Sequence, residues 1–309
     1  MKQIKRNNRK KQDAFEIRCS PDVLCTIGKT PLIQIGKIYA KLETTNPSGS
    51  VKDRMVHYMV YKAEKDGKLK PGSRIIEVTS GNTGIAFAMI AAHRGYRFTA
   101  IMPESMSLQR RHMMEAFKAE IILTPAEEDM AGAIKKYNKI IKKYPDAWLP
   151  KQFENPDNIA AHREGLGKEI IEETNGRVDA FVAGIGTGGT LIGVAQALKE
   201  VTPHVKIIGL EPEESSVLSG GRAGFHEIQG IGEGFIPKIV QEHMDLIDEI
   251  VKVKSNDAIA MGDLLARKYG ILVGISSGAN VLVATKVRDR YRNVVTILPD
   301  RGERYLGYG

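Results

Sequence analysis

A lysine at the probable start of a helix is the first candidate for chemistry in this chain. Lys52 follows the turn-forming stretch Asn46-Pro-Ser-Gly-Ser-Val51 and opens a predicted helix. The partial positive charge at a helix N-terminus disfavours an ammonium group, so it favours the neutral amine that forms a Schiff base with a carbonyl. Most lysines are solvated surface residues. Lys52 is therefore a candidate for holding a cofactor, and the other motifs must decide its role.

A turn rich in hydroxyl groups is the second candidate. Thr79-Ser-Gly-Asn-Thr-Gly84 follows the strand-like run 75–78 and precedes the apolar run Ile85–Ala92. Such a turn presents hydroxyls and free backbone N–H groups at a helix N-terminus, which suits a carboxylate. An ordinary helix cap has the same composition. The motif alone leaves both interpretations open.

A glycine-rich turn, Gly184-Ile-Gly-Thr-Gly-Gly-Thr190, follows the apolar run Val178–Ala183 and precedes a predicted helix over Leu191–Lys199. Glycines let the backbone approach an anion closely, and the threonine hydroxyls add donors for a phosphate. A plain tight turn explains many such runs. The turn lacks the Gly-Lys-Ser/Thr ending of a nucleotide P-loop and the acidic residue that accompanies a dinucleotide site.

Further segments complete a longer pattern: Gln152-Phe-Glu-Asn-Pro156, Gly230-Ile-Gly-Glu-Gly-Phe235, Gly274-Ile-Ser-Ser-Gly-Ala279 and Leu298-Pro-Asp-Arg-Gly-Glu-Arg-Tyr305. From about Thr26 to Tyr305, the order and spacing of these motifs resemble the cysteine synthase (O-acetylserine sulfhydrylase) and cystathionine β-synthase family of fold-type II pyridoxal-phosphate enzymes. The joint match is far more specific than any single motif.

The resemblance implies a role for each matching residue. Lys52 would hold pyridoxal 5'-phosphate as an imine and move the α-proton, Asn82 would face the ring hydroxyl, and Ser276 would face the pyridine nitrogen. The implied phosphate loop comprises Gly186, Thr187, Gly188, Gly189 and Thr190. The implied substrate site comprises Thr79, Ser80, Gly81, Thr83, Gln152 and Gly230. The histidines have no metal-ligand spacing, so we expect no metal.

The implied reaction is a β-replacement that makes L-cysteine from O-acetyl-L-serine and sulfide through an α-aminoacrylate. Glu233 stands where typical cysteine synthases carry alanine, which leaves cystathionine β-synthase or a sulfide-producing cysteine lyase as alternatives to a solvated loop glutamate. Arg222 could pair with a phosphate, which makes O-phosphoserine a further candidate donor. An alternative outside enzymology is a ligand-sensing module that binds a partner.

The elements that must position these motifs alternate along the chain. Strand-like runs are predicted at 38–43, 74–79, 98–102, 120–124, 178–183, 205–210, 250–253 and 294–298. Amphipathic segments at 130–143, 158–173 and 257–268 lie between them. This alternation predicts an α/β fold with mainly parallel sheets. By family resemblance, two open twisted sheets flanked by helices are expected, as in the β subunit of tryptophan synthase.

Length and the resemblance together predict the domain organisation. At 309 residues the chain fits two domains. We expect a flexible basic arm at 1–12, a smaller mobile domain at 40–150, and a larger domain from 13–39 and 151–309 that binds the cofactor phosphate. The arm carries six of the net +8 charges, and a solvated tail is a simpler interpretation than nucleic-acid binding.

Composition indicates a soluble enzyme of the cytoplasm. No apolar run approaches the ~18 residues of a membrane span. The two cysteines, Cys19 and Cys25, are not spaced as C-x-x-C and are interpreted as free thiols in a reducing compartment. The expected ligands are an amino-acid substrate and sulfide. By resemblance, a homodimer and a complex with serine acetyltransferase are also expected.

Overall fold

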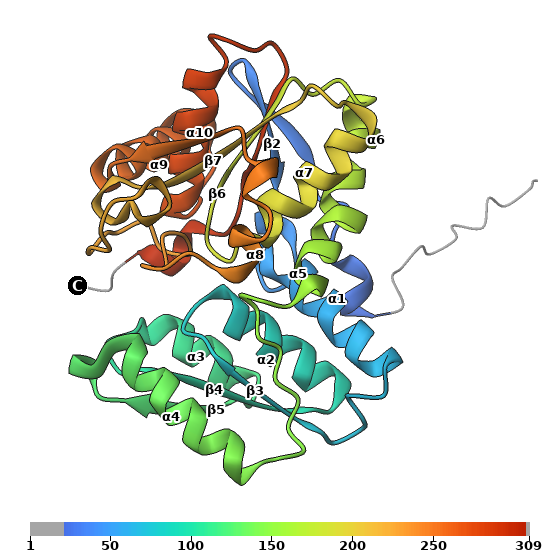
Figure 1. Cartoon of the computed structure of the whole chain (residues 1–309), viewed down its shortest axis with the longest axis vertical. Helices are drawn as coiled ribbons and strands as arrows, with labels where there is room; N and C mark the ends of the chain where they lie inside the picture. The colour runs from blue at the N-terminus through green and yellow to red at the C-terminus, as the bar shows by residue number, and fades with distance from the viewer. Residues whose placement is uncertain (1–21, 307–309) are drawn as a thin grey trace, which may run out of the picture.

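The computed structural model describes residues 22–306, which form two units built on separate sheets (Figure 1). The six-stranded unit has the strand order β1-β2-β9-β6-β7-β8, and the three-stranded unit has the order β3-β4-β5. The strands are β1 (Leu32–Ile35), β2 (Ile38–Leu42), β3 (Arg74–Val78), β4 (Arg97–Pro103), β5 (Glu120–Thr124), β6 (Ala180–Gly184), β7 (Lys206–Pro212), β8 (Glu249–Val253) and β9 (Val294–Leu298). All pairings are parallel except that of β1 with β2. The expected fold of two open, mainly parallel sheets is confirmed.

The helices flank both sheets. They are α1 (Lys52–Lys65), α2 (Asn82–Arg94), α3 (Leu108–Ala116), α4 (Asp129–Lys143), α5 (Pro156–Ala161), α6 (Lys168–Thr174), α7 (Gly189–Val201), α8 (Lys238–Gln241), α9 (Ser255–Tyr269) and α10 (Ile275–Val287). The sequence predicted one helix over 158–173, whereas the structure has a π-helical stretch, His162–Gly167, between α5 and α6. At the start of α5, Asn155 caps the helix by accepting from the Asp157 N–H at 2.9 Å.

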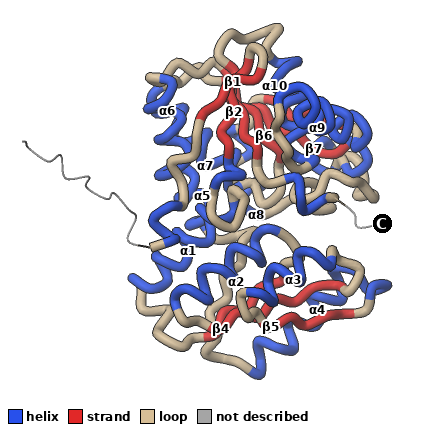
Figure 2. Tube along the Cα trace, turned by 180° about the vertical axis from the view of Figure 1, so that it is seen from behind, coloured by secondary structure: helices blue, strands red, loops and turns tan. Residues whose placement is uncertain are grey.

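Alternating side chains let each sheet pack against helices on both faces (Figure 2). In the three-stranded unit, Ile75 packs with α1 and α2, whereas Ile76 packs with α4. In the six-stranded unit, Val182 belongs to the core formed with α9 and α10, and its neighbour Phe181 belongs to the core formed with α6 and α7. Burial on both faces explains why these strands read as continuous apolar runs in the sequence.

Two segments far apart in the sequence meet at the start of α1. The Val51 N–H donates to the Pro299 carbonyl oxygen at 2.8 Å, and the Arg301 N–H donates to the Gly49 carbonyl oxygen at 3.2 Å. Ser50 and Asp300 form an isolated antiparallel bridge between these bonds. Because Pro299 follows β9 directly, this pairing places Lys52 at the carboxyl end of the six-stranded sheet.

The predicted domain boundary at residue 40 falls inside a strand of the larger sheet. Residues 40–42 belong to the six-stranded sheet, because β2 pairs with β9 over this range and Ala40 lies opposite Thr296. The strands of the smaller sheet and helices α2–α4 do lie within the predicted range 40–150. The mobility of that unit stays a prediction, and the predicted basic arm at 1–12 lies outside the described residues.

Two general properties concern residues 22–306 alone. In that range, the structure contains no helix that is long and apolar enough to cross a membrane. The same residues include no cluster of three His, Cys, Asp or Glu side chains that could hold a metal ion. Cys25 is a free, exposed thiol, whereas Cys19 lies outside the described residues.

Candidate active site

A cavity lies at the carboxyl ends of β6 and β9, which are neighbours in the six-stranded sheet. Its empty volume is about 480 Å³, including space open to solvent. Small-molecule sites favour such a position in parallel sheets. The sequence-predicted residues in its wall are Lys52, Asn82, Gly186, Thr187, Gly188, Thr190, Gly230 and Ser276. The fold therefore brings residues from α1, α2, α7 and α10 to one place.

Lys52 is the first residue of α1 and is half-buried in the cavity wall. Burial lowers the pKa of its ammonium group, while the negative charges of Glu233 and Asp300 act in the opposite direction. A lowered pKa increases the fraction of neutral amine, which is the form that a nucleophile or a base needs. The setting of Lys52 thus suits covalent binding of an aldehyde and transfer of a proton.

The glycine-rich turn connects β6 to the N-terminus of α7. Gly188 is the N-cap of α7, has a φ of +89°, and provides no side-chain cap. The Gly189 N–H makes a long 3.4 Å bond to Thr187 Oγ1, and the other first-turn N–H groups of α7 keep their capacity to bind an anion. A Cβ atom on Gly186 would lie 2.4 Å from the Gly230 carbonyl oxygen, so the close approach of these two segments requires glycine.

Two buried side chains that the sequence did not identify as functional support this turn. Asn158 donates from Nδ2 to Thr187 Oγ1 at 3.0 Å, and His162 Nε2 lies 3.2 Å from Thr190 Oγ1. Burial lowers the pKa of His162 well below its usual value, so the ring is neutral. The sequence analysis left His162 without a role. His162 lies four residues after Asn158, a spacing that predicts one shared helix face. This spacing is the feature of the sequence that could have indicated a common role.

The hydroxyl-rich turn ends at the N-terminus of α2. Gly81 is the N-cap of this helix, and Thr83 in its first turn donates from Oγ1 to Gln152 Oε1 at 2.8 Å. Asn82 is the member of this turn that lines the cavity. The other predicted substrate residues of this region, Thr79, Ser80, Gly81, Thr83 and Gln152, are placed beside Asn82 on the side of the three-stranded unit.

The amide of Asn82 is held by residues near the end of the described chain. Asn82 Nδ2 donates to Asp300 Oδ2 at 2.7 Å, and Arg304 Nη1 donates to Asn82 Oδ1. The sequence analysis identified Leu298–Tyr305 as one of the motifs but gave no role to Asp300 or Arg304. Contacts between such distant positions leave no local pattern in the sequence.

Ser276 is the second residue of α10, and 4% of its surface is exposed. Its hydroxyl group can donate or accept a hydrogen bond, whereas an ionised carboxylate can only accept. A hydroxyl at a ring nitrogen therefore does not hold that nitrogen fully protonated.

Glu233 lines a second cavity of about 220 Å³, which shares Gly186 with the main cavity. Its Oε1 atom lies 3.6 Å from the position that a Cβ on Gly186 would occupy. Taken as a whole residue, Glu233 is exposed. The surrounding protein nevertheless desolvates the carboxyl group and raises its pKa, while Lys52 lowers it. Arg222 is exposed and lines neither of these two cavities.

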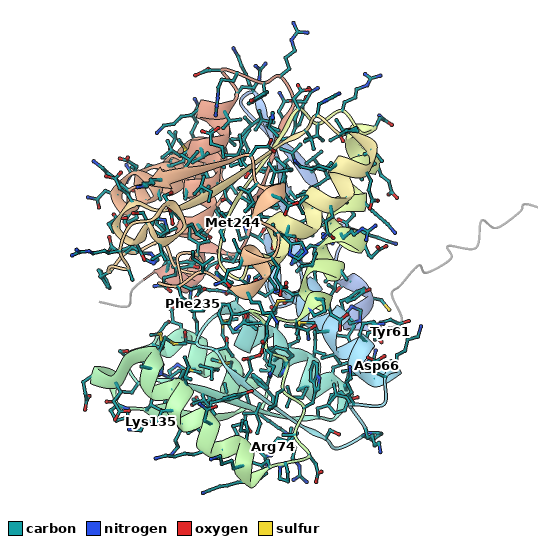
Figure 3. The ribbon with its side chains drawn as sticks, in the orientation of Figure 1. Tyr61, Asp66, Arg74, Lys135, Phe235 and Met244 are labelled. Atoms are coloured by element: carbon teal, nitrogen blue, oxygen red, sulfur yellow. The ribbon has the colours of Figure 1, made fainter. Side chains whose placement is uncertain are left out.

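Phe235 lines the second cavity and lies at the edge of the six-stranded unit that faces the three-stranded unit (Figure 3). The centroid of its ring lies 5.2 Å from that of Phe153, and the two rings meet edge to face. Phe153 directly follows Gln152 in the sequence. The aromatic pair therefore connects the wall of the second cavity to the segment that carries a predicted substrate residue.

The side chains around the main cavity fit pyridoxal phosphate. The α7 N-terminus and the hydroxyls of Thr187 and Thr190 suit a phosphate dianion, and the amine of Lys52, whose pKa is lowered by burial, suits an aldehyde. The phosphate cradle also has no room for larger residues, because a Cβ on Gly189 would lie 1.9 Å from Asn158 Oδ1. Ser276 supplies a hydroxyl for a ring nitrogen.

Comparisons with known proteins agree with this geometry. The sequence profile of the family described as "Pyridoxal-phosphate dependent enzyme" matches residues 23–300. Cysteine synthase of Staphylococcus aureus is 46% identical over 292 residues, which cover 91% of this chain and 93% of that protein.

Two solved structures extend the agreement to the fold. Cysteine synthase of Entamoeba histolytica has a TM-score of 0.90 and 44% identity, with 99% of this chain and 93% of that chain covered. The O-acetylserine dependent cystathionine β-synthase of Helicobacter pylori has a TM-score of 0.89 and 41% identity, with 95% of this chain and 99% of that chain covered. The chain thus belongs to the family of pyridoxal-phosphate dependent enzymes, as its sequence motifs predicted.

Proposed function

We propose that this enzyme makes L-cysteine from O-acetyl-L-serine and sulfide by β-replacement, with pyridoxal 5'-phosphate as cofactor. The observation that carries the proposal is the single cavity that unites the desolvated amine of Lys52, the anion-binding turn before α7 and the hydroxyl of Ser276. Cysteine synthases that are 44–46% identical over most of the chain support this reaction rather than another of the family.

The chain's own residues would hold the cofactor at three points. The N–H groups of the α7 N-terminus, with the hydroxyls of Thr187 and Thr190, would bind the phosphate. Lys52 would hold the aldehyde carbon, and Ser276 would face the ring nitrogen. When bound, pyridoxal phosphate withdraws electrons from the substrate α-carbon and so permits loss of the β-substituent.

The N-terminus of α2 would bind the substrate carboxylate. Thr79 and Ser80 offer hydroxyls beside the free N–H groups of this helix, whereas the hydroxyl of Thr83 donates to Gln152 and leaves Thr83 its backbone N–H for the carboxylate. Because Gln152 Oε1 already accepts from Thr83, the Gln152 amide nitrogen keeps its protons for the carboxylate. Asn82 and Gly230 complete the wall on either side. This arrangement would orient the substrate α-carbon toward Lys52.

Lys52 would then act as the base at the α-carbon. Its pKa is lowered by burial, so the amine is available to accept the α-proton and later to return it. The nearby charges of Glu233 and Asp300 stabilise the ammonium form that this transfer creates. A half-buried position in the cavity limits the exchange of that proton with water.

The test is a spectroscopic titration of the purified enzyme loaded with pyridoxal phosphate. Addition of O-acetylserine without sulfide should change the visible absorption, and sulfide should restore it while cysteine is released. Lys52→Ala should abolish both changes. If the absorption of the loaded enzyme does not change with O-acetylserine, this compound is not the donor. If the protein takes up no pyridoxal phosphate, the proposal as a whole is contradicted.

A second candidate function rests on Glu233. Its carboxyl group is close enough to Lys52 for each to shift the pKa of the other, and it lines a cavity next to the main one. A carboxylate there could activate water or bind the amine of a second amino acid. The products would then be serine and sulfide from cysteine, or cystathionine from homocysteine. The similarity to the Helicobacter pylori enzyme supports testing the second of these.

Product analysis of wild type and Glu233→Gln separates these activities. Sulfide, homocysteine and water are offered as acceptors, and O-acetylserine, O-phosphoserine, serine and cysteine as donors. If Glu233 selects the acceptor, Glu233→Gln should lower turnover with homocysteine or water and spare turnover with sulfide. Arg222→Ala should affect O-phosphoserine alone if Arg222 binds its phosphate. Equal losses with every substrate would reject both roles.

The predicted assembly and location are part of the same proposal. A homodimer, a complex with serine acetyltransferase and a cytoplasmic location are supported by the resemblance to cysteine synthases. A smaller mobile domain that closes over the substrate is supported by the separate cores of the two sheets. Light scattering of the enzyme, with and without the acetyltransferase, measures both assemblies.

A further inference from the structure

A polar cluster lies behind Asn82 and consists of the buried residues Ser48, Asp300 and Arg304 and the half-buried Tyr305. Asp300 Oδ2 accepts from Asn82 Nδ2 at 2.7 Å and from the Tyr305 hydroxyl at 2.6 Å. Arg304 donates from Nη1 to Asn82 Oδ1 and from Nη2 to the Ser48 carbonyl oxygen. Asp300 has no exposed surface, and 7% of Arg304 is exposed. Both ends of the Asn82 amide are therefore held by one segment of the chain.

The two contacts fix the direction of the amide. The guanidinium of Arg304 can only donate, so it must face the amide oxygen, and Asp300 as a carboxylate can only accept, so it faces the amide nitrogen. An Asn amide has two N–H donors and Asp300 uses one of them. The second N–H of Asn82 remains for a group in the cavity that Asn82 lines.

Tyr305 is itself held in place by the three-stranded unit. The guanidinium of Arg110 on α3 lies 5.2 Å from the centre of the Tyr305 ring, a distance typical of a cation–π contact. Arg110 is buried, with 6% of its surface exposed, and its Nη1 atom lies 3.9 Å from the position of a Cβ on Gly81. The ring of Tyr305 thus contacts the unit that carries the α2 N-terminus, while its hydroxyl contacts Asp300.

We propose that Tyr305 is a positioning residue, which acts through Asp300 to orient the Asn82 amide toward the bound cofactor. The inference rests on the proposed function because it takes Asn82 to contact pyridoxal phosphate. Without the Tyr305 hydroxyl, Asp300 loses one of the two donors to Oδ2, and its other oxygen, Oδ1, is already buried without a hydrogen-bond partner. With fewer donors to fix its position, the carboxylate can rotate away from Asn82 and release the amide.

The experiment is a double-mutant cycle on the binding of pyridoxal phosphate. Cofactor-free protein is titrated with pyridoxal phosphate, and its visible absorption gives the dissociation constant for wild type, Tyr305→Phe, Asn82→Ala and the double variant. Tyr305→Phe should weaken binding about tenfold, the effect of one hydrogen bond to a charged acceptor. In the Asn82→Ala background, the same change should cause no further loss, because the group that Tyr305 positions is absent.

Tyr291→Phe is a matched control. The Tyr291 ring also faces an arginine, with the Arg290 guanidinium 5.6 Å from its centre, and Tyr291 is partly buried. This variant should bind pyridoxal phosphate as wild type does. Thermal unfolding of the cofactor-free proteins, measured in parallel, separates loss of positioning from loss of stability.

Three results would overturn the inference. Tyr305→Phe could bind the cofactor normally, or its effect could add in full to that of Asn82→Ala. Asn82→Ala could also bind pyridoxal phosphate as wild type does, which removes the contact on which the inference rests but leaves the proposed reaction intact. By contrast, failure of the wild type to bind pyridoxal phosphate would contradict the proposed function itself.

Discussion

The hydroxyl of Thr83 donates a 2.8 Å hydrogen bond to Oε1 of Gln152, and both side chains are buried. Thr83 lies in the first turn of α2, whereas Gln152 lies on the segment between α4 and α5. The bond therefore connects the three-stranded unit to the chain that leaves it. It also fixes the Gln152 amide, so that the nitrogen rather than the oxygen is free for a substrate.

Gln152→Glu should therefore weaken substrate binding and spare cofactor binding. The glutamate keeps an acceptor for Thr83 but replaces the amide donor with a negative charge that repels the substrate carboxylate. The KM for O-acetylserine should rise at least about tenfold, with an unchanged affinity for pyridoxal phosphate. Gln34→Glu, the same change at the exposed residue of β1, should leave both values unchanged. An unchanged KM in Gln152→Glu would remove Gln152 from the substrate site.

Gly189→Ala should impair the phosphate site. The new Cβ would lie 1.9 Å from Asn158 Oδ1, so Asn158 must move and release Thr187. Overpacking of this kind typically costs about 1–3 kcal/mol of folding stability. The displaced Thr187 hydroxyl would in addition lose its bond to the phosphate, which should lower cofactor affinity about tenfold.

Gly262→Ala provides the control for that change. It lies inside α9, and a Cβ there would meet no atom within 4 Å. It should leave cofactor affinity unchanged and stabilise the fold by up to about 1 kcal/mol. Normal cofactor binding by Gly189→Ala would contradict the assignment of this turn to the phosphate.

Glu77 should make stability fall as the pH rises. This residue on β3 is buried, and burial raises the pKa of its carboxyl group to about 7 from an ordinary 4.5. Between these pH values the native state holds a proton that the unfolded chain has released. Stability therefore declines from pH ~4.5 upward, by a total of up to about 3 kcal/mol above pH ~7.

Glu77→Gln removes this titration and keeps the shape of the side chain. The free energy of unfolding in urea, measured for both proteins from pH ~5 to pH ~8, should favour the variant increasingly up to pH ~7 and by a constant amount above it. A difference that is the same at every pH would show that Glu77 titrates normally in the native state.

Arg54 should be essential to stability although it is only two residues from Lys52. Its guanidinium contacts Glu43 through Nε at 2.6 Å and Nη2 at 2.9 Å, and contacts Glu169 through Nη1 at 2.7 Å. Arg54→Met leaves Glu43, which has no exposed surface, without its cation. The free energy of unfolding should fall by about 3–5 kcal/mol.

An exposed ion pair gives the comparison for Arg54. Arg163 pairs with Glu200 on the surface, where 43% of the first side chain and 56% of the second are exposed. Arg163→Met should change the free energy of unfolding in urea by at most about 1 kcal/mol. Equal effects of the two substitutions would show that burial does not set the strength of the Arg54 cluster.

The sequence predicted most of the fold because burial on both faces gives parallel strands a distinctive composition. The predicted strand at 294–298 coincides with β9, whose five residues are all buried, and the predicted strand at 120–124 coincides with the less buried edge strand β5. Strand β1 was not predicted. Its four residues, Leu32–Ile35, are mostly half-buried and pair antiparallel with β2 at the sheet edge, so they lack the continuous apolar run of the central strands. The π-helical stretch His162–Gly167 was also missed, since the residues around it have an ordinary helical pattern.

Some residues of the candidate site were likewise predicted from the sequence, and others were not. Lys52 and the turn Gly186–Thr190 were predicted because turn-forming residues before a helix are a local signal. Asp300, Arg304 and Tyr305 were not assigned, because Asp300 meets Asn82 across 218 residues of sequence. Such contacts depend on how the two sheets are placed, and no local pattern of residues encodes that placement.

The pairing of residues 49–51 with residues 299–301 sets the order in which the molecule can mature on the ribosome. The strands of the three-stranded unit lie within residues 74–124, so this unit can form from the first half of the nascent chain. Strand β9 lies between β2 and β6, so the larger sheet stays open until residues 294–298 emerge. Lys52 is translated early but gains its neighbours last, and a chain that stops before β9 cannot assemble the cofactor pocket.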